Sequence, residues 1–228
     1  MKGKEFFISG IDTDCGKTYV TGLLAYHLKK SGKKVITSKL IQTGCQGISE
    51  DILAHRKMME SEVLPEDKSG ITCPIVLSYP ASPHLAATID KVDIDFSLFR
   101  KNVNQLLDRY EIVLSEGAGG LMVPLTPNFL ILDYIKEHQL PLILVSSSKL
   151  GSINHTLLSI QTCLLHQINL HSFLYNQMPG DDKIIGNDSF EFFKSYLKSH
   201  SPETQIIHSR QLEKNEHFNF EDSGKIFP

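Results

Sequence analysis

A glycine-bounded loop between an apolar segment and an amphipathic segment constrains the fold of this chain more than any other feature. The loop, Ser9–Thr18, has the sequence Ser-Gly-Ile-Asp-Thr-Asp-Cys-Gly-Lys-Thr and follows the apolar run Phe6–Ile8. The residues after the loop repeat at the spacing of an α-helix, at Val20, Leu23, Leu24, His27 and Leu28. A strand, a glycine-rich loop and a helix in this order are the context of a phosphate-binding loop, so we expect a nucleoside-triphosphate site here.

The end of this loop, Gly16-Lys17-Thr18, has the residue types that bind nucleotide phosphates. Glycines let backbone N–H groups approach phosphate oxygens, a lysine brings a cation to the β- and γ-phosphates, and a threonine hydroxyl can ligate Mg²⁺. The usual pattern has four residues between its glycines, whereas five separate Gly10 from Gly16. A Gly-Lys-Thr triplet alone is as often an ordinary helix start, so the flanking strand and helix carry the interpretation.

Composition limits the classes of protein to which the chain can belong. The 228 residues, 41% hydrophobic and 21% charged, indicate one soluble globular domain. A net charge of −3 gives no support for a nucleic-acid partner, and the basic run Lys29–Lys34 suits a helix end. The four cysteines include no CxxC pair, which argues against a disulfide framework or a zinc site. Because we find neither a signal peptide nor an apolar run of membrane-spanning length, we expect a cytoplasmic protein without a membrane partner.

Strand and helix patterns alternate along the rest of the chain. Apolar runs predict strands near 35–38, 112–114, 142–145, 173–175 and 205–207. Helical spacing predicts helices from 50, from 85, over 95–110, from 153 and around 190–197. Residues 61–83 are predicted to be a loop, and the polar tail from about 208 is predicted to be irregular. This alternation predicts an α/β fold, a single-domain doubly wound and mostly parallel sheet of the P-loop NTPase type over residues 1–228, with ligands at the carboxyl ends of the strands.

Three further polar residues stand where such a sheet binds its ligand. Lys39 ends one strand, although a solvated loop lysine is the plainer interpretation. Asp51 opens the next helix, where it would either cap or charge-complement that helix or help to bind Mg²⁺. Glu116 ends an apolar strand, as a Walker-B carboxylate does, and the glycines that follow allow close backbone approach to a ligand. A structural turn would explain those glycines but not the acidic residue.

Together these motifs resemble those of the dethiobiotin synthetases, a family of biotin biosynthesis. The resemblance covers roughly residues 5–180, and the longer phosphate-binding loop is the family's own variant. The motifs that carry it are Gly10–Thr18, Lys39 with Thr43-Gly44, Asp51, Pro80–His84, Glu116–Gly120 and Lys149–His155.

The resemblance implies an ATP-dependent cyclo-ligase that also needs Mg²⁺. Such an enzyme carboxylates 7,8-diaminopelargonate with CO₂, supplied as bicarbonate, and closes the ring to dethiobiotin. The steps pass through a carbamate and a carbamic-phosphoric anhydride and release ADP and phosphate. The resemblance also implies a homodimer with a shared substrate site.

The resemblance assigns roles to individual residues. The catalytic cations would be Lys17 and Lys39. The nucleotide would contact Asp14, Cys15, Gly16, Lys17, Thr18, Tyr19, Asp51, Glu116, Gly117, Ala118, Gly119 and Asn176. Mg²⁺ would be held by Thr18, Asp51 and Glu116. The substrate would contact Thr13, Lys39, Thr43, Ser152, Ile153 and Asn154. The last three would come from the partner subunit and bind the substrate carboxylate through backbone N–H groups, whereas the plainer interpretation is that Ser152 only caps its helix.

Departures from the family pattern leave some points open. Asp14 stands where glutamate is usual, and Thr43 stands where serine is common. We can align no counterpart of the family's later base-contacting segment in Gln205–Glu216, so other nucleoside triphosphates remain possible co-substrates.

Two rival classes share the predicted architecture. A nucleotide switch of the partitioning or septum-site type would carry an extra lysine early in the loop, and Gly10–Asp12 has none. An amidating synthetase of the cobyrinate type would need a glutamine-hydrolysing domain, for which 228 residues leave no room.

Overall fold

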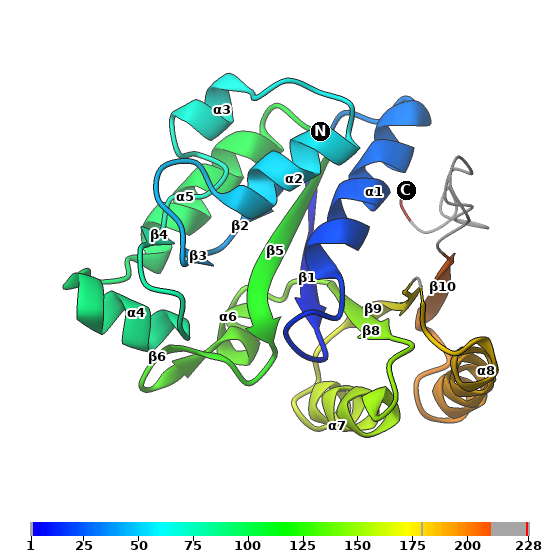
Figure 1. The fold of residues 1–228 in the computed structure, drawn as a ribbon. Coiled ribbons are helices and arrows are strands. Elements are labelled where there is room, and N and C mark those ends of the chain that lie inside the picture. Colours follow the sequence, from blue (N-terminus) through cyan, green and yellow to red (C-terminus); the bar gives the residue numbers. More distant parts are fainter. Residues whose placement is uncertain (1, 179, 211–226, 228) are drawn as a thin grey trace.

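A six-stranded sheet forms the centre of the molecule in the computed structural model, which describes residues 2–178, 180–210 and 227 (Figure 1). The strands lie in the order β10-β9-β8-β1-β5-β2, and all neighbouring pairs are parallel. Their bounds are β1 Lys4–Gly10, β2 Val35–Lys39, β5 Ile112–Gly120, β8 Leu142–Ser147, β9 Leu170–Gln177 and β10 Gln205–Arg210. The predicted doubly wound parallel sheet is therefore confirmed.

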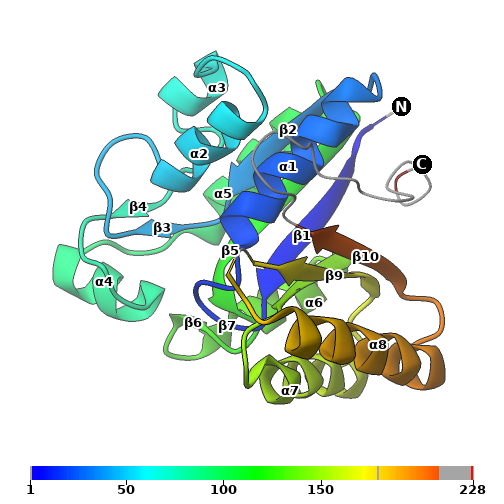
Figure 2. The same ribbon diagram turned by 45° about the vertical axis from the view of Figure 1, so that its right-hand side comes forward.

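Helices cover both faces of this sheet (Figures 1 and 2). Alternate residues of β1 belong to two different cores, because successive side chains of a strand point to opposite faces. Phe6 and Ile8 pack with Leu24 of α1, whereas Phe7 packs with Phe99 of α5 and Tyr134 of α6. The bounds are α1 Lys17–Lys30, α2 Glu50–Met58, α5 Phe96–Leu107, α6 Ile131–Glu137, α7 Ser152–Leu165 and α8 Lys183–His200.

The prediction that 61–83 is a loop is wrong in part. This segment contains the one-turn helix α3, Pro65–Lys68, and the strand β4, Val76–Leu77. The second is a two-residue strand that pairs in parallel with β3, Gln42–Thr43. Elements this short have no measurable hydrophobic period, so the sequence pattern could not indicate them.

Two more deviations follow from short elements and from a proline. Helix α4, Pro83–Asp90, begins two residues before its predicted start, because a proline fits the first turn of a helix. A small antiparallel pair, β6 Pro124–Thr126 with β7 Phe129–Leu130, precedes α6, and the sequence patterns had indicated none of these three elements.

The predicted irregular tail begins as regular structure. Strand β10 continues to Arg210 and pairs with β9 over its whole length. Phe227 is buried and packs its ring edge-on against Phe6, with the centroids 4.8 Å apart. The rest of the predicted tail lies outside the described residues, and so does the second half of Gln205–Glu216, in which no counterpart of the base-contacting segment could be aligned. Within the described ranges, no helix is long and apolar enough to cross a membrane.

Candidate active site

In the loop between β1 and α1, the Lys17 side chain folds back over the loop's own backbone. The Lys17 ammonium donates a hydrogen bond to the Asp12 carbonyl oxygen at 2.8 Å. A Cβ atom at Gly10 would lie 2.9 Å from Lys17 Nζ and 2.5 Å from Cys15 Sγ, so only glycine fits there. Helix α1 has no acidic side chain in its first turn, which leaves the positive end of its dipole available to a phosphate.

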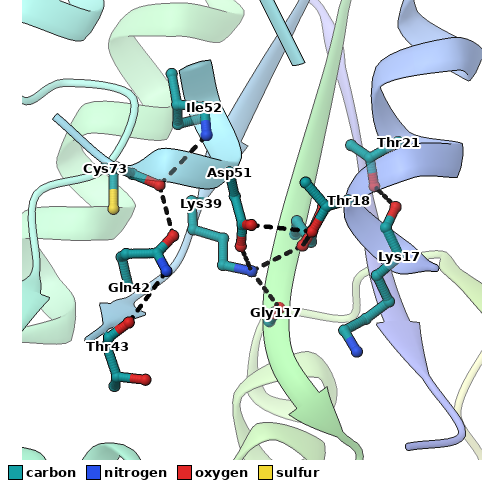
Figure 3. Close-up of polar contacts among 12 residues, drawn as sticks. Lys17, Thr18, Thr21, Lys39, Gln42, Thr43, Asp51, Ile52, Cys73 and Gly117 are labelled. Carbon is teal, nitrogen blue, oxygen red and sulfur yellow. Dashed lines mark hydrogen bonds and ion pairs between the residues drawn. The ribbon is translucent and has the colours of Figure 1, made fainter. Parts of the chain in front are cut away.

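Four polar side chains from four separate elements meet beside this loop (Figure 3). Thr18 Oγ1 lies 3.0 Å from Asp51 Oδ1 and 3.2 Å from Glu116 Oε1. Lys39 Nζ lies 2.5 Å from Asp51 Oδ2 and 2.7 Å from Glu116 Oε1, and it also donates to the Gly117 carbonyl oxygen at 3.1 Å. The structure thus brings together the residues predicted to bind Mg²⁺ and the predicted catalytic Lys39.

The structure contradicts two of the plainer interpretations, namely Lys39 as a solvated loop lysine and Asp51 as a helix cap. Lys39 is 4% exposed and paired with two carboxylates, so it is no solvated loop lysine. The cap of α2 is Ser49, whose Oγ accepts from the Ile52 N–H at 3.3 Å. Asp51 therefore does not cap its helix, although it lies in the first turn, where a carboxylate complements the helix dipole. Its side chain contacts Thr18 and Lys39.

Burial and charge act in opposite directions on this cluster. Burial alone would raise the pKa of Glu116, but the Lys39 charge and the His55 hydrogen bond outweigh it and hold that pKa far below its usual range. Burial alone would lower the pKa of Lys39, but the charges of Glu116 and Asp51 raise it above its usual range. Both Lys39 and Glu116 are therefore charged at neutral pH.

The donor set of the cluster fits Mg²⁺. A hydroxyl and two carboxylates supply hard oxygen ligands, which Mg²⁺ prefers. Among the described residues, no group of three or more His, Cys, Asp or Glu side chains could hold a metal. A cation here would therefore take further ligands from phosphate oxygens and water, as is usual for Mg²⁺ at nucleotide sites.

A cavity of about 690 Å³ adjoins the cluster. Its volume lies within the usual range for small-molecule sites. One wall is the phosphate-binding loop, and another is formed by Gln42, Thr43 and Pro80–Pro83. The predicted site residues that line it are Thr13, Asp14, Gly16, Lys17, Thr18, Tyr19, Lys39, Thr43, Asp51, Glu116, Ala118 and Gly119.

Three other predicted nucleotide contacts lie just outside this lining. Cys15 is a buried residue of the loop itself. Asn176 Nδ2 donates to the Cys15 carbonyl oxygen at 3.1 Å and so supports the loop from β9. Gly117 contributes its carbonyl oxygen to Lys39. These contacts place the three residues against the loop and the lysine.

The predicted carboxylate-binding residues do not line this cavity. Ser152, Ile153 and Asn154 form the first turn of α7. The cap of α7 is Gly151 in the left-handed conformation (φ 93°), so the interpretation of Ser152 as a simple cap is wrong. Its buried Oγ has no hydrogen-bond partner among the described residues.

Sequence reasoning missed two polar residues of the site. His55 Nε2 lies 3.0 Å from Glu116 Oε2, and its position one helical turn after Asp51 was the available signal. Gln42 Oε1 accepts from Ser49 Oγ at 2.7 Å, which ties the cavity wall to the cap of α2.

A parallel sheet with this loop after its first strand, and a carboxylate ending a neighbouring strand, defines a P-loop NTPase. An AAA domain family matches residues 4–214. The chloroplast FtsY from Physcomitrella patens aligns with a TM-score of 0.56 at 14% identity, over 100% of this chain and 66% of that one. FtsY from Thermotoga maritima aligns with a TM-score of 0.54 at 14% identity, over 99% of this chain and 67% of that one. Such low identity shows the fold alone.

Relatives of known name narrow the class further. An ATP-dependent dethiobiotin synthetase of Pasteurella multocida is 49% identical over 201 residues, 88% of this chain and 94% of that protein. One of Chlorobaculum tepidum is 48% identical over 198 residues, 87% of this chain and 83% of that protein. The chain belongs to the ATP-dependent dethiobiotin synthetase family, which confirms the resemblance of its motifs and the prediction of an ATP-dependent ligase.

Proposed function

We propose that the protein makes dethiobiotin from 7,8-diaminopelargonate, CO₂ and ATP, with ADP and phosphate as the other products. The observation that carries this proposal is one cavity with a phosphate-binding loop on one wall and Lys39 and Thr43 beside it. In a member of this family, that cavity offers adjacent places for a triphosphate and for a small substrate to be phosphorylated.

The first step forms the carbamate. One amine nitrogen of the substrate attacks the carbon of CO₂, a C–N bond forms and the nitrogen releases a proton. The product carries a negative charge that the amine did not have. Lys39 would stabilise this charge, and the Thr13 and Thr43 hydroxyl groups, which line the same cavity, would orient it.

The second step transfers the γ-phosphoryl group. A carbamate oxygen attacks the γ-phosphorus, the bond to the β–γ bridging oxygen breaks, and ADP leaves. Such a transfer needs in-line positioning and charge neutralisation more than acid–base catalysis. Lys17 and the N-terminus of α1 would bind the phosphates, while Lys39 would lie on the carbamate side. Thr18, Asp51 and Glu116 would hold Mg²⁺, which when bound neutralises phosphate charge.

The third step closes the ring. The second amine attacks the carbonyl carbon of the carbamic-phosphoric anhydride and loses a proton. The bond from that carbon to the phosphate oxygen breaks, and inorganic phosphate leaves. Phosphate is a good leaving group from this anhydride, so the protein's main task in this step is to position the amine.

The proposal includes a second copy of the chain. The substrate carboxylate lies several carbons from the reacting amines, and Ser152–Asn154 lie outside the cavity of their own chain. We assign the backbone N–H groups of this α7 turn to the carboxylate of a substrate bound in the partner. Leu158 and Leu165 support the assignment, because they lie two turns apart on α7 and are exposed.

The proposal also covers the domain organisation of the chain and its location in the cell. We assign residues 1–228 to one domain, because the strands of its sheet come from both ends of the chain. A cytoplasmic location agrees with the four cysteines, all of which are free and buried.

Phosphate release tests the proposal directly. ATP hydrolysis should be slow alone and should rise only when diaminopelargonate and bicarbonate are both present, with dethiobiotin detected by mass spectrometry. Release that ignores both substrates would identify a nucleotide switch instead. Replacing ATP with GTP or CTP in the same assay measures the base preference.

A further inference from the structure

We propose that His55 is a positioning residue that fixes the Glu116 carboxylate toward the metal site and Lys39. This inference rests on the proposed function, because it concerns how that site holds its cations. The inference rests on the observation that the two carboxylate oxygens of Glu116 contact different groups.

The two oxygens of Glu116 have different partners. Oε1 faces Thr18 Oγ1 at 3.2 Å and Lys39 Nζ at 2.7 Å. Oε2 faces His55 Nε2 at 3.0 Å on the side of α2. The terminal torsion of a glutamate is broad, so nothing in the side chain itself selects this orientation. A fixed donor at Oε2 leaves Oε1 directed at the site.

Hydrogen-bond chemistry determines where the imidazole proton lies. An ionised carboxylate only accepts hydrogen bonds, so the hydrogen must be on His55 Nε2. Nδ1 is buried and has no hydrogen-bond partner among the described residues. The hydrogen bond to Glu116 is therefore the one polar contact that the ring makes with a described residue. A side chain needed only to fill this space would require no nitrogen at that position.

Helix packing holds the ring in place and excludes water from it. His55 and Glu116 are both 0% exposed. Helices α1 and α2 approach closely at Gly22, where a Cβ atom would lie 3.3 Å from the His55 Cα and 2.6 Å from Met58 Sδ. Since Asp51 and His55 are one turn apart, α2 supplies both a metal ligand and the support for the second carboxylate.

Loss of the His55 N–H donor should therefore lower the affinity for the metal, and its effect should not be limited to the stability of the fold. Supporting residues around a metal site typically contribute about 10- to 100-fold in metal affinity or activity. In His55→Leu we expect the protein–ADP complex to bind Mn²⁺ about 10-fold or more weakly, as measured by electron paramagnetic resonance. His55→Gln keeps an N–H donor at about the reach of Nε2, so it should restore most of the affinity. His200→Leu, at an exposed position at the end of α8, is the matched control.

A double-mutant cycle separates positioning from packing. If His55 acts through Glu116, His55→Leu should change Mn²⁺ affinity in the wild-type background but not in Glu116→Gln. Equal Mn²⁺ affinity of wild type and His55→Leu, or an equal loss in both backgrounds, would overturn the inference. If His55→Leu does not fold, His55→Gln decides: wild-type affinity supports a donor role, and a 10-fold loss in a folded protein contradicts it. A wild-type protein that makes no dethiobiotin would overturn the proposed function instead, because the Mn²⁺ measurement needs no turnover.

Discussion

Lys39 and Glu116 lie in direct register on neighbouring parallel strands, and their side chains form a buried ion pair at 2.7 Å. The two residues are 77 positions apart in the chain. They meet because β5 inserts between β1 and β2, so that the carboxyl ends of all three strands lie at one edge. The strand order thus places a cation beside the strand-end carboxylate.

This ion pair predicts that catalysis and stability respond differently to substitution. Lys39→Met should lower turnover by roughly 100-fold or more, because a preorganised charge at the reacting groups is lost. It should also lower the melting temperature, because Glu116 is left buried without its main counter-charge. In the double variant Lys39→Met with Glu116→Gln, the melting temperature should recover while dethiobiotin formation stays low. Recovery of both would show that Lys39 serves only the fold.

The carboxylates predict a metal dependence. Asp51→Asn and Glu116→Gln should each raise the Mg²⁺ concentration needed for half-maximal phosphate release, because each replaces an anionic oxygen ligand with a neutral one. Asp95→Asn is the matched control, because Asp95 is an exposed helix cap and asparagine caps equally well. A Mg²⁺ requirement that is unchanged in both site variants would remove these residues from the metal site.

Local sequence patterns could predict many residues of this site, but they could not predict the long-range contacts between side chains. The strand before Gly10, the helix after Lys17 and the acidic end of β5 each lie within a short window of sequence, so their periodicity and motifs indicated them. The contact of His55 with Glu116 spans 61 positions and depends on how closely α1 and α2 pack. The spacing of His55 from Asp51 places the two residues on the same face of α2, but it does not indicate that the ring contacts Glu116.

The same limit explains why α3 was missed. Its one turn is held by Arg56, whose guanidinium donates to both carboxylate oxygens of Asp67 at 2.8 Å. Asp67 also accepts from the Leu64 N–H and the Thr72 hydroxyl. The helix exists because of a buried ion pair with α2, and its own four residues show no hydrophobic period.

This buried pair predicts a pH-dependent stability. Burial alone would raise the pKa of Asp67, but hydrogen bonds and the charge of Arg56 lower it below its usual value. A lowered folded-state pKa adds stability that is present above the unfolded-state pKa, about 3.9, and is lost as pH falls below it. Asp67→Asn should therefore cost about 3–5 kcal/mol of unfolding free energy at pH 7. In urea titrations the difference from wild type should shrink below about pH 4. A constant difference would show that charge is not involved.

The position of the α7 turn outside its own cavity leads to the last prediction, which concerns a shared site. Lys39→Ala inactivates one chain, and Ile153→Pro removes one backbone N–H from the α7 turn of another while fitting the first turn of a helix. In a mixed dimer, one site would combine the intact Lys39 of the second chain with the intact Ile153 of the first. Activity should therefore return on mixing to about a quarter of wild type, since half the dimers are mixed and each has one good site. Dethiobiotin formation measures the recovery, and native mass spectrometry establishes that mixed dimers form. If folded mixed dimers remain inactive, each site lies within one chain, and the α7 turn does not bind the partner's substrate.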